Sequence, residues 1–149
     1  MHRASNTDNP ANLSRLAAAF GSLEIPVIFP LHPRTRKMLE TFSISLPPNV
    51  FAIEPVGYLE MLALEENADC ILTDSGGIQK EAYWLGVRCI TLRDETEWVE
   101  TVQSGWNILA GCDDARIRDA FQNWHPSGAR SPIYGDGHAA ERIAAILTA

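Results

Sequence analysis

Residues 74–77, Asp-Ser-Gly-Gly, have types and spacing that could support chemistry. They lie between the apolar run 70–73 and a helical pattern. Glycine has no Cβ, so the backbone can approach an anion closely, and the unpaired N–H groups of a helix start point toward it. Glu81, about one turn into the helix, could then accept hydrogen bonds from a sugar diol. The segment is a candidate phosphate-binding turn. A strand, a Gly-Gly turn and a helix are also common in α/β proteins, so the pattern alone leaves a plain loop open.

Composition limits the kinds of partner that this chain can have. With 149 residues and 46% hydrophobic content it has the material for one complete core, and we expect a single domain over residues 1–149. Twelve Lys and Arg against nineteen Asp and Glu give a net charge of −7, which argues against nucleic acid and against an anionic membrane surface. An anionic ligand would therefore need a local site. No signal-peptide pattern and no run of membrane-spanning length is present in the sequence.

The cysteines predict a reducing compartment. Cys70, Cys89 and Cys112 are odd in number, lie in or beside apolar runs and lack the spacing of metal ligands. We interpret them as reduced packing residues of a cytoplasmic protein. The four histidines are scattered and none shows ligand spacing with a cysteine or another histidine, so the sequence predicts no metal site.

The apolar spacing alternates between strand-like runs and helix-period segments, which predicts an α/β fold: a Rossmann-like parallel sheet with helices on both faces. In the helix over 58–66 we expect Leu59, Leu62 and Ala63 to face inward, and a polar loop over 93–100. We expect strands over 25–29, 50–53, 70–73, 88–92 and 106–109, and helices over 10–20, 33–42, 58–66, 76–85, 113–124 and 139–147.

A strand is missing from this pattern. Residues 2 and 3, His-Arg, fall where the loop after a first strand belongs, yet no strand precedes them. We therefore expect a truncated first strand, because upstream residues are absent or another chain supplies that position. Ligands of open α/β sheets bind beyond the carboxyl ends of the strands. The residues expected at such ends are His2, His32, Val56, Ser75 and Arg93.

Several segments in a fixed order resemble one known family. They are His-Arg at 2–3 with Asn6, His-Pro-Arg-Thr at 32–35, the segment 74–81, Leu-Arg-Asp-Glu-Thr-Glu at 92–97, and Tyr-Gly-Asp-Gly-His-Ala-Ala-Glu-Arg-Ile at 134–143. Together they cover nearly the whole chain and resemble the UDP-N-acetylglucosamine 2-epimerases of the non-hydrolysing type. The resemblance is to the C-terminal domain only.

The resemblance implies a GT-B architecture, in which two Rossmann-like domains face each other across a cleft and the C-terminal one grips UDP. It assigns the diphosphate to Ser75, Gly76 and Gly77, and the ribose hydroxyls to Glu81. Val56 and Met61 match positions near the uracil. Viewed without the family, the position of Met61 on its helix favours a core residue.

The basic residues at the other strand ends have two interpretations each. By resemblance His2 is catalytic and stabilises the departing UDP, although a second residue with no strand before it could also be disordered. His32 and Arg34 either supply positive potential to the site or cap the neighbouring helix and pair with surface acids. For Arg93, too, both a contribution to the site and a role in surface ion pairs remain open.

Three positions depart from the family pattern. Trp98 stands where the family often has arginine, so a ligand contact there is in doubt. Ser5 and Lys80 replace residues that are often glutamate. Ser5 weakens the inference of an activator site near the histidine.

The resemblance implies a reaction that interconverts UDP-N-acetylglucosamine and UDP-N-acetylmannosamine by elimination and re-addition of UDP, with no metal or redox cofactor, in cell-envelope polysaccharide biosynthesis. The family's catalytic carboxylates lie in the N-terminal domain, which this chain does not match. We expect little or no activity from the chain alone, and association as a homodimer or with a missing N-terminal half.

Two other functions remain open. The chain could be a nucleotide-binding module or a degenerate fragment without activity. It could also be the UDP-binding half of another GT-B enzyme, a hydrolysing epimerase or a glycosyltransferase, against which the run at 92–97 counts.

Overall fold

The computed structural model describes residues 1–148, in which helices and parallel strands alternate along the chain. The strands are β1 (Val27–Pro30), β2 (Val50–Ile53), β3 (Cys70–Thr73), β4 (Arg88–Thr91) and β5 (Asn107–Leu109). The helices are α1 (Ala4–Thr7), α2 (Pro10–Gly21), α3 (Pro33–Thr41), α4 (Tyr58–Glu66), α5 (Gly76–Leu85), α6 (Val99–Gln103), α7 (Asp114–Asn123) and α8 (Ala139–Leu147).

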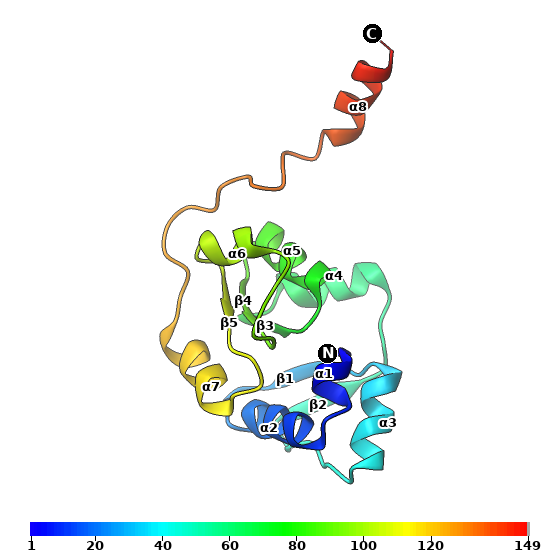
Figure 1. Cartoon of the computed structure of the whole chain (residues 1–149), viewed down its shortest axis with the longest axis vertical. Helices are drawn as coiled ribbons and strands as arrows, with labels where there is room; N and C mark the ends of the chain where they lie inside the picture. The colour runs from blue at the N-terminus through cyan, green and yellow to red at the C-terminus, as the bar shows by residue number, and fades with distance from the viewer. Residues whose placement is uncertain (149) are drawn as a thin grey trace.

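The strands form two parallel sheets rather than one. β1 pairs with β2, and β3, β4 and β5 pair in that order, with helices flanking both groups (Figure 1). The predicted α/β fold with parallel strands is confirmed. A cavity of about 820 Å³, which we call the slot, is lined by residues 27–30 of β1 and 70–73 of β3. The slot thus lies between the neighbouring edges of the two sheets.

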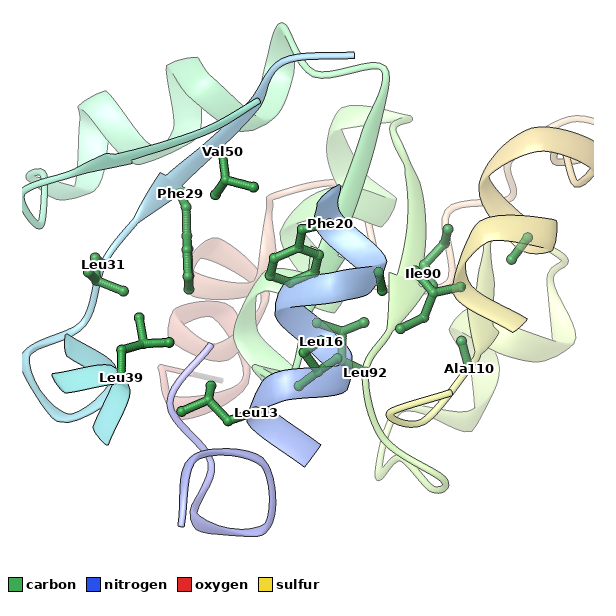
Figure 2. Packing of buried hydrophobic residues seen from close by; sticks show 13 residues of the cluster. Leu13, Leu16, Phe20, Phe29, Leu31, Leu39, Val50, Ile90, Leu92 and Ala110 are labelled. Atoms are coloured by element: carbon green, nitrogen blue, oxygen red, sulfur yellow. The ribbon is translucent and has the colours of Figure 1, made fainter. Parts of the chain in front are cut away.

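Helix α2 holds the two sheets together. Asn9 caps its first turn by accepting a hydrogen bond from the N–H of Ala11 at 2.9 Å, and Pro10 at the first helical position has a backbone already suited to a helix start. Its buried face packs against both sheets (Figure 2), and Phe20 meets Phe29 of β1 edge to face at 5.8 Å. The strands contribute Phe29 of β1, Val50 of β2 and Ile90 of β4 to this core, and Leu92 joins them just after β4.

Most predicted elements have the predicted bounds or differ by one or two residues. Gly86 ends α5 in the left-handed region, at φ 74°, as its position after the last periodic residue predicts. Two short helices were not predicted. α1 is too short to show a period, and α6 begins at Val99 inside the segment that we expected to be a polar loop.

The predicted inner face of α4 is wrong. Leu59 is 78% exposed and Ala63 is also exposed, whereas Glu65 is only 3% exposed. Apolar residues occur on every side of this helix, so their spacing does not specify which side is buried. Which side of α4 is buried is decided by its packing against the rest of the fold.

Helix α8 lies apart from the rest of the molecule, at the end of an extended segment (Figure 1). None of its described residues is buried, and Ile143, Ile146 and Leu147 are among the most exposed large apolar side chains. Across residues 1–148, no helix has both the length and the apolar character required to cross a membrane.

Glu65 gives the fold a pH dependence that can be measured. Both oxygens of its carboxylate are buried without a hydrogen-bond partner, and burial, with the charge of Glu81 as a smaller cause, raises its pKa from 4.5 to about 7. At a pH where such a carboxyl is protonated in both the folded and the unfolded state, its raised pKa does not lower the free energy of unfolding. Its charged form then destabilises the fold as the pH rises from 4.5 through about 7.

We therefore expect the stability of Glu65→Gln, relative to that of the natural chain, to increase as the pH rises. The difference in free energy of unfolding should grow by about 1–3 kcal/mol between about pH 4.5 and pH 8. Urea unfolding across this range measures it, with the exposed Glu66→Gln as the control. A difference that stays constant with pH would mean that folding does not raise the pKa of Glu65.

Candidate functional site

A buried carboxylate organises the carboxyl end of β3. Asp74 has no exposed surface, and its oxygens accept hydrogen bonds from the main-chain N–H groups of His2 at 3.0 Å and Arg3 at 2.9 Å. The side-chain amide of Asn6 donates to the same carboxylate at 3.2 Å and to the carbonyl of Leu92 at 2.9 Å. The start of the chain is thereby fixed beside the ends of β3 and β4.

The turn after Asp74 begins α5, and its first main-chain N–H groups have no partner within the helix. Ser75 is the N-cap of α5, and its hydroxyl makes no capping bond. Its own N–H donates to Oγ1 of Thr73 at 3.0 Å, and its carbonyl accepts the N–H of Gln79. The N–H groups of Gly76, Gly77 and Ile78 precede the first intrahelical bond, so they carry the partial positive charge of the helix start. This is a place where an anion can be held.

The two glycines of the turn have different reasons to be glycine. A Cβ at Gly76 would lie 2.5 Å from Nε1 of Trp98, so the indole, rather than a ligand, occupies that space. A Cβ at Gly77 would meet only the Ser75 hydroxyl, at 3.8 Å, and Gly77 is exposed. The sequence argument of close approach to an anion therefore applies to the open side at Gly77. At Gly76 the close approach is made by Trp98, whose ring also lies 3.8 Å from the Lys80 ammonium.

Glu81 lies on α5 beyond the turn, and the apolar candidates Val56 and Met61 lie in the lining of the slot. Glu81 is four residues beyond Gly77, so it shares a helix face with it, about 6 Å along the axis. Val56 and Met61 are half-buried and line the slot together with Ile78, one residue after the glycines. Helix α5 thus carries the turn and Glu81 on one face, and its Ile78 contributes to the apolar lining of the slot.

His2 lies between two strand ends. Its ring is 5.3 Å from the ring of His32, and its Nδ1 is 3.7 Å from Asp74. Burial lowers the pKa of His2, Asp74 opposes this, and the nearby positive groups add to the lowering. A neutral imidazole is favoured, which keeps one N–H donor beside the helix start.

The remaining predicted cations are engaged elsewhere. Nδ1 of His32 accepts the N–H of Arg34 and so caps α3, while the guanidinium of Arg34 pairs with Asp8. Arg93 forms a bidentate pair with Glu97, both bonds at 2.9 Å, and this pairing lowers the pKa of Glu97 to about 2 and raises that of Arg93. Within residues 1–148, neither guanidinium makes a hydrogen bond to the turn at 75–77.

A buried polar network lies behind the turn and was not predicted from the sequence. The Oε1 atom of Gln79 accepts hydrogen bonds from Thr96 at 2.6 Å and from Asn107 at 3.2 Å, and Asn107 also meets Thr91 and Thr101. The network fixes the 93–98 loop onto α5 and so positions Trp98. Isolated polar residues in apolar surroundings were the only signal, and such residues do not reveal their partners.

The segment before α8 secures the other end of α5. The guanidinium of Arg130 donates to the carbonyls of Tyr83 and Trp84, and the hydroxyl of Tyr83 donates to the carbonyl of Ser131 at 2.6 Å. Tyr134 then lies edge to face against Trp98, with ring centroids 6.3 Å apart. The described part of the chain holds no group of three His, Cys, Asp or Glu side chains arranged to hold a metal ion.

The fold and this geometry define an α/β domain of parallel strands, with a candidate ligand site at the carboxyl ends of those strands. The family model described as UDP-N-acetylglucosamine 2-epimerase matches residues 1–148. The chain belongs to the UDP-N-acetylglucosamine 2-epimerase family.

Individual relatives agree with this assignment. A UDP-N-acetylglucosamine 2-epimerase homolog of Methanococcus maripaludis is 48% identical over 99% of this chain and 43% of its own length. A UDP-2,3-diacetamido-2,3-dideoxy-D-glucuronate 2-epimerase of Pseudomonas aeruginosa is 43% identical over 99% and 42%. The crystal structure of the Methanocaldococcus jannaschii UDP-GlcNAc 2-epimerase in complex with UDP-GlcNAc and UDP has a TM-score of 0.88 at 42% identity, over 99% of this chain and 43% of that one. The chain therefore spans less than half the length of these relatives.

Removal of the Asp74 carboxylate tests its role as an anchor. We expect Asp74→Ala to lower the free energy of unfolding by about 2–4 kcal/mol, because main-chain N–H groups of residues 2 and 3 lose a charged acceptor. Urea unfolding measures the loss. The exposed Asp119→Ala on α7 is the control, with an expected change within about 0.5 kcal/mol. Equal effects of the two substitutions would contradict the anchoring role.

Alanine substitution distinguishes the roles of the two glycines. We expect Gly76→Ala to cost about 1–3 kcal/mol through collision with the indole of Trp98, and Gly77→Ala to be neutral or slightly stabilising. In a Trp98→Ala background the cost of Gly76→Ala should largely disappear, which a double-mutant cycle by urea unfolding measures. The same cost in both backgrounds would show that Trp98 is not the obstacle.

Proposed function

We propose that this chain is the C-terminal, UDP-binding domain of a UDP-N-acetylglucosamine 2-epimerase that interconverts UDP-N-acetylglucosamine and UDP-N-acetylmannosamine. The observation that carries the proposal is the start of α5 at Ser75, Gly76 and Gly77, which is exposed at Gly77, with Glu81 about one turn further along the same helix. This arrangement matches a diphosphate followed by a ribose in both charge and spacing.

Each part of UDP has a counterpart in the site. The diphosphate is held by the main-chain N–H groups of the turn and the hydroxyl of Ser75, where the helix dipole favours negative charge. The two oxygens of Glu81 accept the two ribose hydroxyls. The uracil lies against the apolar wall to which Val56 and Met61 contribute.

His2 faces the leaving group in this proposal. A neutral imidazole beside the helix start can donate its N–H to the diphosphate as the bond to the sugar breaks, which stabilises the charge that develops there. His32 orients the ring of His2 from the other side. Arg34 and Arg93 contribute positive potential from their ion pairs at a distance, rather than by direct contact.

The reaction proceeds by elimination and re-addition of UDP, which needs a base at the C2 carbon of the sugar as well as a cradle for the diphosphate. This domain supplies the cradle, and the base belongs to an N-terminal domain. We infer that the chain acts with that domain, within one polypeptide or as a homodimer of the complete protein. The purified chain alone, incubated with UDP-N-acetylglucosamine, should give no epimer detectable by NMR.

The cell compartment follows from the same proposal. A nucleotide sugar and three free cysteines suit the reducing cytoplasm, where precursors of cell-envelope polysaccharides are activated. A second sugar is also compatible, because the relative from Pseudomonas aeruginosa is named for a diacetamido glucuronate. Both substrates carry the UDP that this domain is proposed to hold.

Calorimetric titration with UDP tests the proposal. We expect saturable binding by the chain, weakened by about 1–3 kcal/mol in Glu81→Ala because the ribose hydroxyls and their surroundings lose a polar partner. Glu141→Ala on the exposed helix α8 is the matched control and should bind like the natural chain. Equal affinity of the natural chain and a folded Glu81→Ala would contradict the assignment of Glu81.

A further inference from the structure

Lys80 places a cation beside the first turn of α5. It follows Gly76 by four residues and Gly77 by three, so it shares their face of the helix, and helical side chains point back toward the helix start. Its ammonium lies 3.8 Å from the centroid of the Trp98 ring. The Nε1 atom of that indole lies 2.5 Å from the point that a Cβ of Gly76 would occupy. The charge is thus held close to the N–H groups with which the helix begins.

The indole that carries this ammonium is itself fixed in place. The main-chain N–H of Trp98 donates to Oγ1 of Thr96 at 3.1 Å, and its carbonyl accepts a hydrogen bond from the hydroxyl of Thr101 at 2.7 Å. The ring of Tyr134 packs against the indole edge to face, with centroids 6.3 Å apart. The cation–π contact therefore gives Lys80 a defined position, which lowers the cost of ordering its long side chain when a ligand binds.

Lys80 has no carboxylate partner within residues 1–148. Arginines that pair with a carboxylate at 2.9 Å or less stand at 34, 36, 88, 93 and 142. Lys80 forms neither an ion pair nor a side-chain hydrogen bond with any described residue, although it is half-buried. The adjacent Glu81 does not compensate it, because consecutive residues of a helix do not face each other. Its charge is available to a ligand.

An anion at the turn would change the electrostatics of this cation. The start of a helix carries partial positive charge, which repels an ammonium held beside it. A diphosphate at the same place attracts both, so repulsion is replaced by attraction on binding. The N–H groups of the turn are neutral donors, and the guanidinium groups of Arg34 and Arg93 are engaged by Asp8 and Glu97. Lys80 adds formal positive charge where the ligand would need it.

We propose that Lys80 is a further diphosphate-binding residue of this site, positioned by the ring of Trp98. The inference rests on the proposed function, because it adds a residue to the UDP site at the start of α5. The carbon stem of Lys80 stays on the indole, and the ammonium donates a charge-assisted hydrogen bond to a phosphate oxygen. Lys80 therefore makes the site discriminate a nucleoside diphosphate from the nucleoside alone.

Amine labelling tests this contact in the natural chain, which has two lysines, Lys37 and Lys80. Lys37 is exposed on α3 and is the internal control. The full chain reacts with N-hydroxysuccinimide acetate, and mass spectrometry follows the acetylation of each lysine. With UDP at about ten times its Kd, acetylation of Lys80 should slow by about tenfold, while that of Lys37 stays unchanged. Uridine at the same multiple of its own Kd should protect neither lysine.

Substitution separates the charge of Lys80 from its packing. Lys80→Met keeps an apolar stem on the indole but has no charge, so calorimetry should show UDP binding weakened by about tenfold and uridine binding unchanged. Lys80→Arg should restore most of the affinity for UDP, because it retains the charge and the stacking. Lys37→Met is the matched control and should bind UDP like the natural chain.

The outcomes distinguish this inference from the proposed function. If the natural chain binds UDP but Lys80 is acetylated equally fast with and without it, Lys80 is not a ligand of the diphosphate and the UDP site stands. Equal affinity of Lys80→Met and the natural chain for UDP has the same meaning. An equal loss of UDP and uridine binding in Lys80→Met would show that Lys80 only maintains the shape of the site. A natural chain that does not bind UDP would overturn both.

Discussion

The contact on which the site depends is the buried carboxylate of Asp74. It comes directly after β3 and directly before the candidate anion-binding turn, and it holds the main chain of residues 2 and 3 by charged hydrogen bonds. The same group therefore sets the position of the imidazole of His2 and the direction in which α5 begins. Through Asn6 it also ties the end of β3 to the end of β4. Because water is excluded from Asp74, these bonds are stronger than equivalent bonds on the surface, and three separate pieces of chain are aligned by one side chain.

What could be predicted from the sequence is what depends on neighbours along the chain. Periodicity located the strands β2 and β3 and the helices α4, α5 and α8, and the Gly-Gly turn located the helix start. Contacts between distant segments could not be found in this way. They include the indole of Trp98 against Gly76, the network around Gln79, and the burial of Glu65 instead of Leu59. In each case the partner is selected by the packing of elements that lie far apart in the sequence, and residue type alone does not encode it.

Family membership and the site together explain how relatives named for different sugars can share this domain. Two relatives at 48% and 43% identity are named for an acetylglucosamine and for a diacetamido glucuronate. UDP is the part that both names have in common, and the features described here suit UDP: a helix start, a carboxylate one turn on, and an apolar wall.

Trp98 has a consequence beyond the packing of Gly76. Its indole lies against the first residue of α5, under the ammonium of Lys80 and beside the ring of Tyr134. The emission of an indole responds to charge and polarity next to its ring, and an anion at this helix start would bring both. The protein therefore carries its own optical reporter a few ångströms from the turn, and occupancy of the turn becomes visible as a change of intrinsic fluorescence without any added label.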